Sequence, residues 1–148
     1  MSPDDRTADR AALRRLVDAY ASAVDGGDPD GCAALFTPDG VLCRADDPEE
    51  RFTRHGRVEI AAAMRGLARY ESTSHRLGDH VVTFDGDDEA SGLIDCEAHH
   101  VSVTSDECRT DKVMTIHYRD EYRRDGSGAW RIEARRLHVD HEETSSLD

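Results

Sequence analysis

The chain has 148 residues, of which 19 are basic and 32 acidic, and its formal net charge is −13 with the histidines neutral. This length predicts a single domain, residues 1–148, that buries roughly 70% of the surface its unfolded chain exposes. Acidic residues are interleaved with the arginines along most of the chain, so no basic face is expected and the overall field repels a phosphate backbone. The charge pattern therefore argues against nucleic acid as a partner.

No segment has the sequence features of a membrane span or a secretion signal. The longest apolar runs, Cys32–Phe36 and Ile60–Met64, are far shorter than the roughly 20 residues that a spanning helix needs. Charged side chains occupy the N-terminal stretch where a signal peptide has an apolar segment. The four cysteines lie far apart and form no C-x-x-C pair. We therefore expect a cytoplasmic protein with reduced thiols and no contact with a membrane.

The first half of the chain has the periodicity of helices. Apolar residues recur with a spacing of about 3.6 over residues 7–24, which predicts an amphipathic helix ended by two glycines. Asp28 followed by Pro29 predicts the cap and first turn of a short second helix. The following segments are predicted as a turn over 37–40, a strand over 41–43, an acidic loop over 45–50 and a third helix over 58–70.

The second half alternates between apolar and polar residues. Strands are predicted over 75–84, 89–103, 112–124 and 129–139, joined by turn-rich segments, and the polar tail over 142–148 is expected to fray, leaving an ordered core of about 7–140. Helices followed by such a meander indicate an α+β fold, in which one curved sheet wraps around the N-terminal helices. Alternation places Cys96 and His100 on one face of their strand, and Tyr118 and Asp120 on one face of the next.

Several segments resemble the SnoaL-like branch of the nuclear transport factor 2-like superfamily. They are Tyr20–Asp28 running into Ala33–Gly40, Gly56–Ala61, Thr73–His75, and Tyr118–Tyr122 through Trp130–Ile132. The resemblance spans nearly the whole chain and implies a cone-shaped α+β barrel with a curved antiparallel or mixed sheet. It is less specific for the reaction, because this fold hosts isomerases, dehydratases, cyclases and proteins without catalysis.

Within this superfamily, Asp25 and His75 resemble an Asp/His dyad that removes a proton from carbon. A neutral imidazole accepts a proton only if its other nitrogen is held, and a carboxylate does this. The resemblance therefore implies His75 as general base, oriented by Asp25. It also implies a set of substrate-binding residues, Tyr20, His100, Asp120 and Arg135. Some members have a lysine on the first helix that assists a departing halide; no lysine stands near Asp25 in this sequence, which disfavours dehalogenation.

Each of these residues also has a structural interpretation. Asp25 can satisfy backbone groups at a helix end, His75 can be an ordinary strand residue, and Tyr20 can belong to the core. His100 can be a surface neighbour of His99, Arg135 can offset the acidic surface, and Asp120 can pair with an arginine. Asp46 or Asp47 in the acidic loop offers another candidate base, by its similarity to the place of the aspartate base of isomerases in the family.

Two functions remain open on this basis. The first is a cofactor-independent lyase or isomerase, of the dehydratase or cyclase type, acting on a small apolar molecule that carries a carbonyl or enol. The alternative is a non-catalytic domain of the same fold that binds a small ligand or a protein. No metal is expected, because His75, His100, His117 and His138 form no ligand pair of typical spacing. The resemblance also implies an exposed sheet face, for which we expect a homodimer or homotrimer.

Overall fold

The computed structural model describes residues 6–148. Its helical elements are α1 (Thr7–Asp25), α2 (Pro29–Ala33), α3 (Gly56–Arg65) and the short 3-10 helix η1 (Gly66–Arg69). Its strands are β1 (Phe36–Arg44), β2 (Arg54–His55), β3 (Ser72–Phe84), β4 (Glu89–Val103), β5 (Arg109–Arg124) and β6 (Trp130–Ser146).

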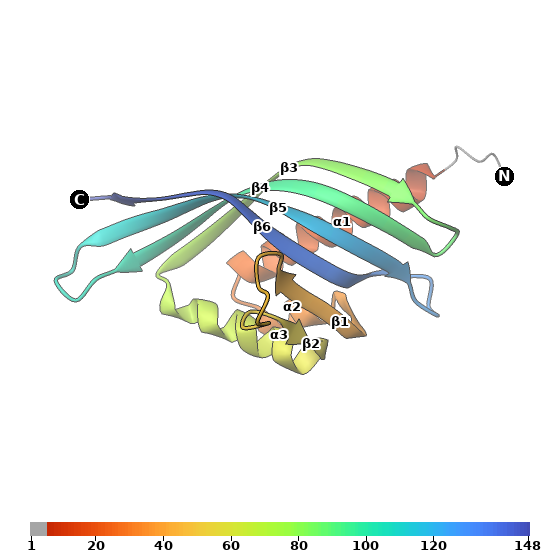
Figure 1. Cartoon of the computed structure of the whole chain (residues 1–148), viewed down its shortest axis with the longest axis horizontal. Coiled ribbons are helices and arrows are strands. Elements are labelled where there is room, and N and C mark those ends of the chain that lie inside the picture. The colour runs from red at the N-terminus through yellow and green to blue at the C-terminus, as the bar shows by residue number, and fades with distance from the viewer. Residues whose placement is uncertain (1–5) are drawn as a thin grey trace.

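The strands form one mixed sheet in the order β2-β1-β6-β5-β4-β3. β1 runs parallel to β6, and the other neighbours are antiparallel. The long strands curve over α1, while α2, α3 and β1 lie below them (Figure 1). β2 and β3 are free edges, so the sheet is curved but not closed. The fold is the expected cone-like α+β arrangement, with the N-terminal helices on the concave side.

The apolar face of α1 supplies much of the core. Its buried residues are Leu13, Leu16, Val17, Tyr20, Ala21 and Val24, which are the positions that the helical periodicity predicts. Two arginines of α1 donate hydrogen bonds to carbonyl groups of the edge strand β3, Arg14 to Gly78 at 2.9 Å and Arg10 to Val82 at 3.3 Å. The helix is thereby fixed along β3, and its last residue, Asp25, lies beside the beginning of that strand.

The short helices follow their local signals. The Asp28 side chain accepts a hydrogen bond from the backbone N–H of Gly31 at 3.0 Å and so caps α2, with Pro29 in its first turn. The third helix is shorter than predicted, because α3 ends at Arg65 and the chain tightens into η1 before Tyr70.

Two further expectations differ from the structure. The predicted turn over 37–40 lies inside β1, where the pairing with β6 shifts between Phe36 and Val41, so its turn-forming residues make an irregularity within a strand. The polar segment expected to fray from residue 142 continues β6 as far as Ser146, which pairs with Thr110. β5 is long enough to offer this segment a hydrogen-bonding partner, which a hydropathy pattern does not reveal.

Candidate functional site

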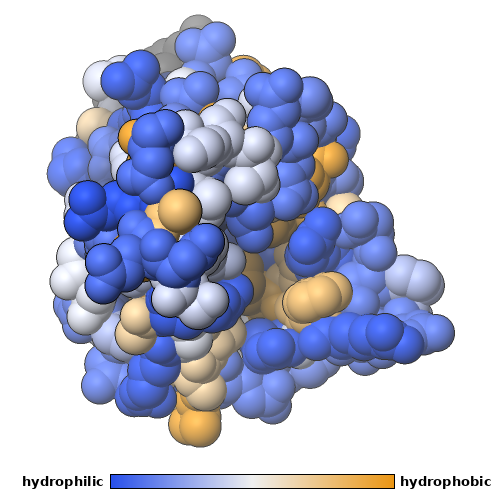
Figure 2. All heavy atoms as spheres, turned by 90° about the vertical axis from the view of Figure 1, so that its left-hand side faces the viewer, coloured by the Kyte–Doolittle hydropathy of each residue, from blue (hydrophilic) through white to orange (hydrophobic). Residues whose placement is uncertain are grey.

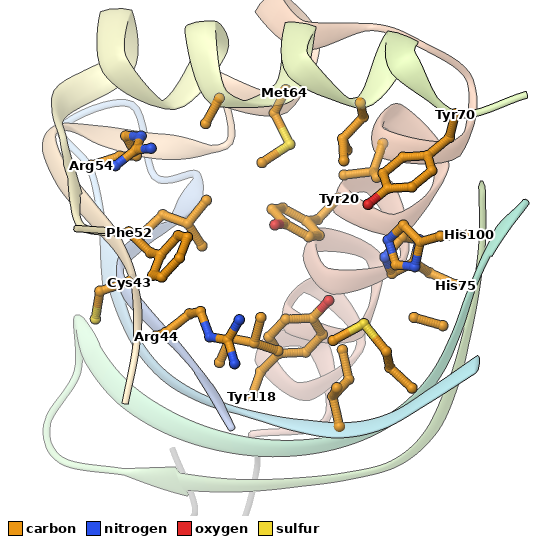
Figure 3. A pocket seen from close by; sticks show the side chains of 18 of the residues that line it. Tyr20, Cys43, Arg44, Phe52, Arg54, Met64, Tyr70, His75, His100 and Tyr118 are labelled. Atoms are coloured by element: carbon orange, nitrogen blue, oxygen red, sulfur yellow. The ribbon is translucent and has the colours of Figure 1, made fainter. Parts of the chain in front are cut away.

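A cavity of about 290 Å³ lies between the concave face of the sheet and the helices α1 and α3 (Figure 3). Most of its lining is apolar, with a few polar groups among the apolar side chains. The end of the molecule at which the strands extend beyond the helices is hollowed, and apolar residues lie in the hollow between hydrophilic ones (Figure 2). An apolar hollow with a few convergent polar groups is typical of a small-molecule site.

Asp25 and His75 meet at the wall of this cavity. One carboxylate oxygen of Asp25, Oδ1, lies 2.7 Å from Nδ1 of His75 and accepts a hydrogen bond from the Thr73 hydroxyl at 2.9 Å. The other oxygen, Oδ2, accepts the backbone N–H of His75 at 2.7 Å. The His75 side chain is 9% exposed and lines the cavity. Since an ionised carboxylate only accepts hydrogen bonds, Nδ1 carries the proton in the neutral ring and Nε2 has a free lone pair.

His100 lies beside His75 on the same wall (Figure 3). Their rings meet edge to face with centroids 5.7 Å apart, and the ring of Tyr70 covers His100 at 4.8 Å. Burial, together with the neighbouring His75 ring and the cations Lys112 and Arg69, lowers the pKa of His100 to about 4. His100 is therefore neutral near pH 7, and its buried Nδ1 has no hydrogen-bond partner among residues 6–148.

Tyr20 and Tyr118 form the centre of the cavity, and their rings meet edge to face at 6.0 Å. Both hydroxyl groups point into the open space (Figure 3). Burial raises the pKa of each phenol, so both are neutral hydrogen-bond donors at ordinary pH. Tyr20 thus occupies the cavity as the resemblance implies, and Tyr118 adds a second hydroxyl that the sequence did not single out.

Asp120 and Arg135, which were expected to touch the substrate, are not among the cavity-lining residues. They form a fully buried ion pair, in which Nε and Nη2 of Arg135 donate to the carboxylate at 2.8 and 2.7 Å. The guanidinium lies 4.3 Å from the Tyr20 ring centroid and 4.0 Å from that of Tyr118. The pair therefore supports the two tyrosines from behind. The prediction from alternation that Asp120 lies on the inner face is confirmed. Alternation does not show how deep within the cone a residue lies.

The same carboxylate anchors a further polar group. Tyr122 donates its hydroxyl proton to Oδ2 of Asp120 at 2.7 Å, and Nε2 of His80 lies 3.0 Å from the Tyr122 oxygen. Gly92 makes room for this contact, because a Cβ there would meet the Tyr122 hydroxyl at 2.6 Å. The Asp120 carboxylate thus accepts three hydrogen bonds, two from Arg135 and one from Tyr122, and stabilises the interior of the fold.

Four basic side chains that the sequence did not single out also line the cavity, namely Arg44, Arg54, Arg69 and Lys112. Lys112 is the single lysine of the chain, and β5 carries it into the site although it is distant in sequence from Asp25. The alternation in this strand could have indicated this position, because Lys112 shares its strand face with Met114 and Tyr118. The two loop aspartates do not line the cavity: Asp47 accepts backbone N–H groups of its own loop, and Asp46 lies near Arg44.

The convex face of the sheet carries two more His–Asp pairs with a similar geometry. Nδ1 of His99 lies 2.7 Å from Asp111, and Nδ1 of His117 lies 2.8 Å from Asp140. Neither histidine lines the cavity. No group of three or more metal-ligating side chains occurs among residues 6–148, and no helix in that part of the chain is long and apolar enough to cross a membrane.

Several solved structures have the same fold, and their names differ. A hexachlorocyclohexane dehydrochlorinase (LinA type 3) of Novosphingobium barchaimii matches with a TM-score of 0.80 and 18% identity, covering 99% of this chain and 97% of that one. ActVI-ORFA of Streptomyces coelicolor matches with a TM-score of 0.74 and 21% identity, covering 91% and 99%. A Novosphingobium aromaticivorans protein named provisionally as a scytalone dehydratase matches with a TM-score of 0.83 and 22% identity, covering 99% and 93%.

These identities are low, so the structural matches show the fold and leave the reaction open. No curated protein is similar to the chain in sequence. The family model described as the SnoaL-like domain matches residues 5–136, which is most of the chain. The protein therefore belongs to the SnoaL-like domain family.

Proposed function

We propose that the protein is a cofactor-independent lyase or isomerase that removes a proton from carbon, with Nε2 of His75 as the general base. The observation that carries the proposal is the hydrogen bond between Asp25 and Nδ1 of His75 at the wall of an apolar cavity. The carboxylate fixes the tautomer with a free Nε2 and stabilises the imidazolium that forms when the proton is taken up.

The two tyrosine hydroxyls supply the complementary half of the chemistry. When a proton leaves carbon next to a carbonyl, negative charge develops on the carbonyl oxygen, and neutral donors such as Tyr20 and Tyr118 stabilise it by hydrogen bonding. The positive charge of Arg135 behind both rings also favours negative charge on this oxygen. Asp120 and Arg135 act here by positioning the tyrosines, and no contact with substrate is assigned to them.

The same arrangement serves two reaction outcomes. In a dehydration, the C–H electron pair forms the new double bond, the C–O bond breaks, and the hydroxyl leaves as water with a proton from a cavity tyrosine. The His75 imidazolium then returns its proton to that tyrosine. In an isomerisation, the imidazolium returns the proton to a different carbon. The substrate class that suits both is a small, largely apolar compound with a carbonyl or enol group.

Proton abstraction can be tested without knowing the natural substrate. In 5-nitrobenzisoxazole, removal of one ring proton by a base breaks the N–O bond and releases a coloured cyanophenolate. We expect the protein to accelerate this reaction above buffer, and we expect His75→Ala to lower the rate by about 100-fold or more, the usual contribution of a general base. The His75→Ala variant should keep its melting temperature, because the ring lies at the cavity wall and not in the packed core.

His99→Ala is the matched control. Its ring makes a 2.7 Å contact with Asp111 but faces away from the cavity, so its loss should leave the rate unchanged. Equal rates for wild type and His75→Ala would refute a base at this position. A wild type without any activity, but with small apolar ligands bound in the cavity, would favour the alternative of a non-catalytic binding domain.

A further inference from the structure

The charged residues around the cavity have the opposite sign to the protein as a whole. The chain carries 32 acidic and 19 basic side chains, yet the charged side chains among the lining residues, histidines aside, are Arg44, Arg54, Arg69 and Lys112. No carboxylate within residues 6–148 is part of the lining. Most other arginines pair with carboxylates, for example Arg65 with Asp30 at 3.0 Å. The lining therefore carries a local excess of positive charge within an acidic protein.

Three of these cations have no acidic partner among the described residues. Arg54 donates to the backbone carbonyls of Arg51 and Thr53, and Arg69 donates to the carbonyl of Gly66. Neither Arg54, Arg69 nor Lys112 forms an ion pair with a carboxylate of residues 6–148, whereas Arg44 lies 3.4 Å from Asp46. Arg54 and Lys112 are half-buried, whereas Arg69 is exposed. A half-buried cation without a counter-charge is costly in an apolar surrounding unless a ligand supplies the negative charge.

Two of the unpaired cations converge on one tyrosine next to the candidate dyad. The Tyr70 oxygen accepts hydrogen bonds from Nη2 of Arg69 at 3.1 Å and from Nζ of Lys112 at 3.4 Å. Lys112 is also the register partner of His100, whose ring contacts His75. With both of its accepted bonds made, the Tyr70 hydroxyl can donate its own proton. The cluster of Arg69, Tyr70 and Lys112 thus offers three kinds of donor within one region.

We propose that the cavity binds a small apolar molecule that carries one anionic group of the carboxylate class, held by Arg69, Lys112 and the Tyr70 hydroxyl. The anion replaces the missing counter-charge, and the apolar body of the molecule lies over Tyr20 and Tyr118, within reach of His75. Arg44 and Arg54 lie on the wall opposite Tyr70 and His100 and add to the positive potential (Figure 3). That this ligand is a substrate rests on the proposed function.

A pair of probes that differ only in charge tests this inference. 2-Naphthoate and 2-naphthamide share their ring system and the planar shape of their head group. We expect calorimetry to show tighter binding of the naphthoate by about tenfold or more, the usual gain from a charge-assisted hydrogen bond. The negative charge of the whole protein opposes this preference, so a general attraction for anions cannot produce it.

Substitutions locate the preference within the cavity. Lys112→Met and Arg69→Gln should each weaken naphthoate by about tenfold and leave naphthamide unchanged. The exposed Arg15→Gln on α1, which removes the same charge without touching the cavity, should change neither affinity. Because Arg69 is exposed, its variant tests the proposal even if Lys112→Met folds poorly. Equal affinity for the two probes, or equal losses in Arg15→Gln and Arg69→Gln, would overturn the anion site.

The single lysine allows a second readout that does not depend on turnover. An amine-specific acylating reagent can modify only Lys112 and the N-terminal amine, and mass spectrometry separates the two. Bound naphthoate should slow modification of Lys112 but not of the N-terminus. Naphthamide should slow modification of Lys112 less than naphthoate does. A charge preference that persists in His75→Ala, which has lost proton abstraction, separates this inference from the proposed function, since either can fail alone.

Discussion

The two faces of the sheet carry similar pairs of side chains in different surroundings. Asp25–His75 on the concave face and Asp111–His99 on the convex face both place a carboxylate oxygen 2.7 Å from Nδ1. The His75 side chain is 9% exposed at the wall of an apolar cavity, whereas that of His99 is 35% exposed on the open side. A hydrogen bond to a carboxylate is therefore not enough to make a histidine a candidate catalytic base. The difference lies in the surroundings of the ring: Nε2 of His99 lies 3.4 Å from a carboxylate oxygen of Glu97 on the open side, whereas His75 lines the cavity.

Neighbouring residues on one strand show the same contrast in their titration. Burial lowers the pKa of His100 to about 4, while the hydrogen bond that His99 donates to Asp111 raises the pKa of His99 above its usual value. The two residues are adjacent in β4 and point to opposite faces of the sheet. His100 on the concave face is therefore neutral near pH 7, whereas the carboxylate contacts of His99 on the convex face favour its cation.

The largest effect is expected for the two neighbouring arginines of β6. Arg135→Met leaves the fully buried Asp120 without its cation and should lower the free energy of unfolding by about 3–5 kcal/mol. Arg136→Met breaks only the exposed pair with Glu121 and should cost about 0–1 kcal/mol. Urea unfolding of both variants measures this difference. Combining Arg135→Met with Asp120→Leu should recover stability, and similar losses in the two single variants would contradict the assigned burial.

A smaller effect is expected from acid. The pKa of His100 is lowered in the folded state. As the pH falls below about 6.5, His100 therefore takes up a proton in the unfolded chain but not in the native protein. His100 therefore costs stability progressively between pH 6.5 and its native pKa of about 4. His100→Phe, which keeps an aromatic ring against Tyr70, should lose less melting temperature between pH 7 and pH 5 than the wild type does.

His99 is expected to change the pH dependence of stability in the opposite direction. Its raised pKa stabilises the folded state below about pH 6.5, and this contribution is lost as the pH rises through the native pKa. His99→Gln should therefore lose stability at pH 5.5 and little at pH 8.5. The change should be small, since the ring is partly exposed. A smaller loss of stability on acidification in His99→Gln than in His100→Phe would contradict the assignment of the two faces.

The sequence was sufficient for most helices and strands and for which strand face is buried, although it placed a turn inside β1 and ended the last strand too early. The periodicity of α1, the cap at Asp28 and the alternation in β4 and β5 are local signals, and the structure agrees with each of them. Depth within the fold was not predictable in this way. Asp120 lies on the expected inner face, but it is enclosed with Arg135 behind the tyrosines, because strand curvature and helix packing decide how far the cavity reaches.

The cationic part of the cavity was also missed. Arg69 follows α3, Lys112 lies on β5 and Arg44 ends β1, so these residues come together only through the curvature of the sheet and the placement of η1. Their separation in sequence hides the cluster within a chain that is acidic overall. The role of His75 as a base stays a prediction until a reaction is measured.

The most direct test compares the two carboxylates that hold the two histidines. Asp25→Asn and Asp111→Asn remove the same charge from the same kind of contact, at 2.7 Å in each case. With 5-nitrobenzisoxazole, we expect Asp25→Asn to lower the rate of proton abstraction by about 100-fold, because the His75 tautomer is no longer fixed, and Asp111→Asn to leave it unchanged. Equal rates for the two variants would contradict the account.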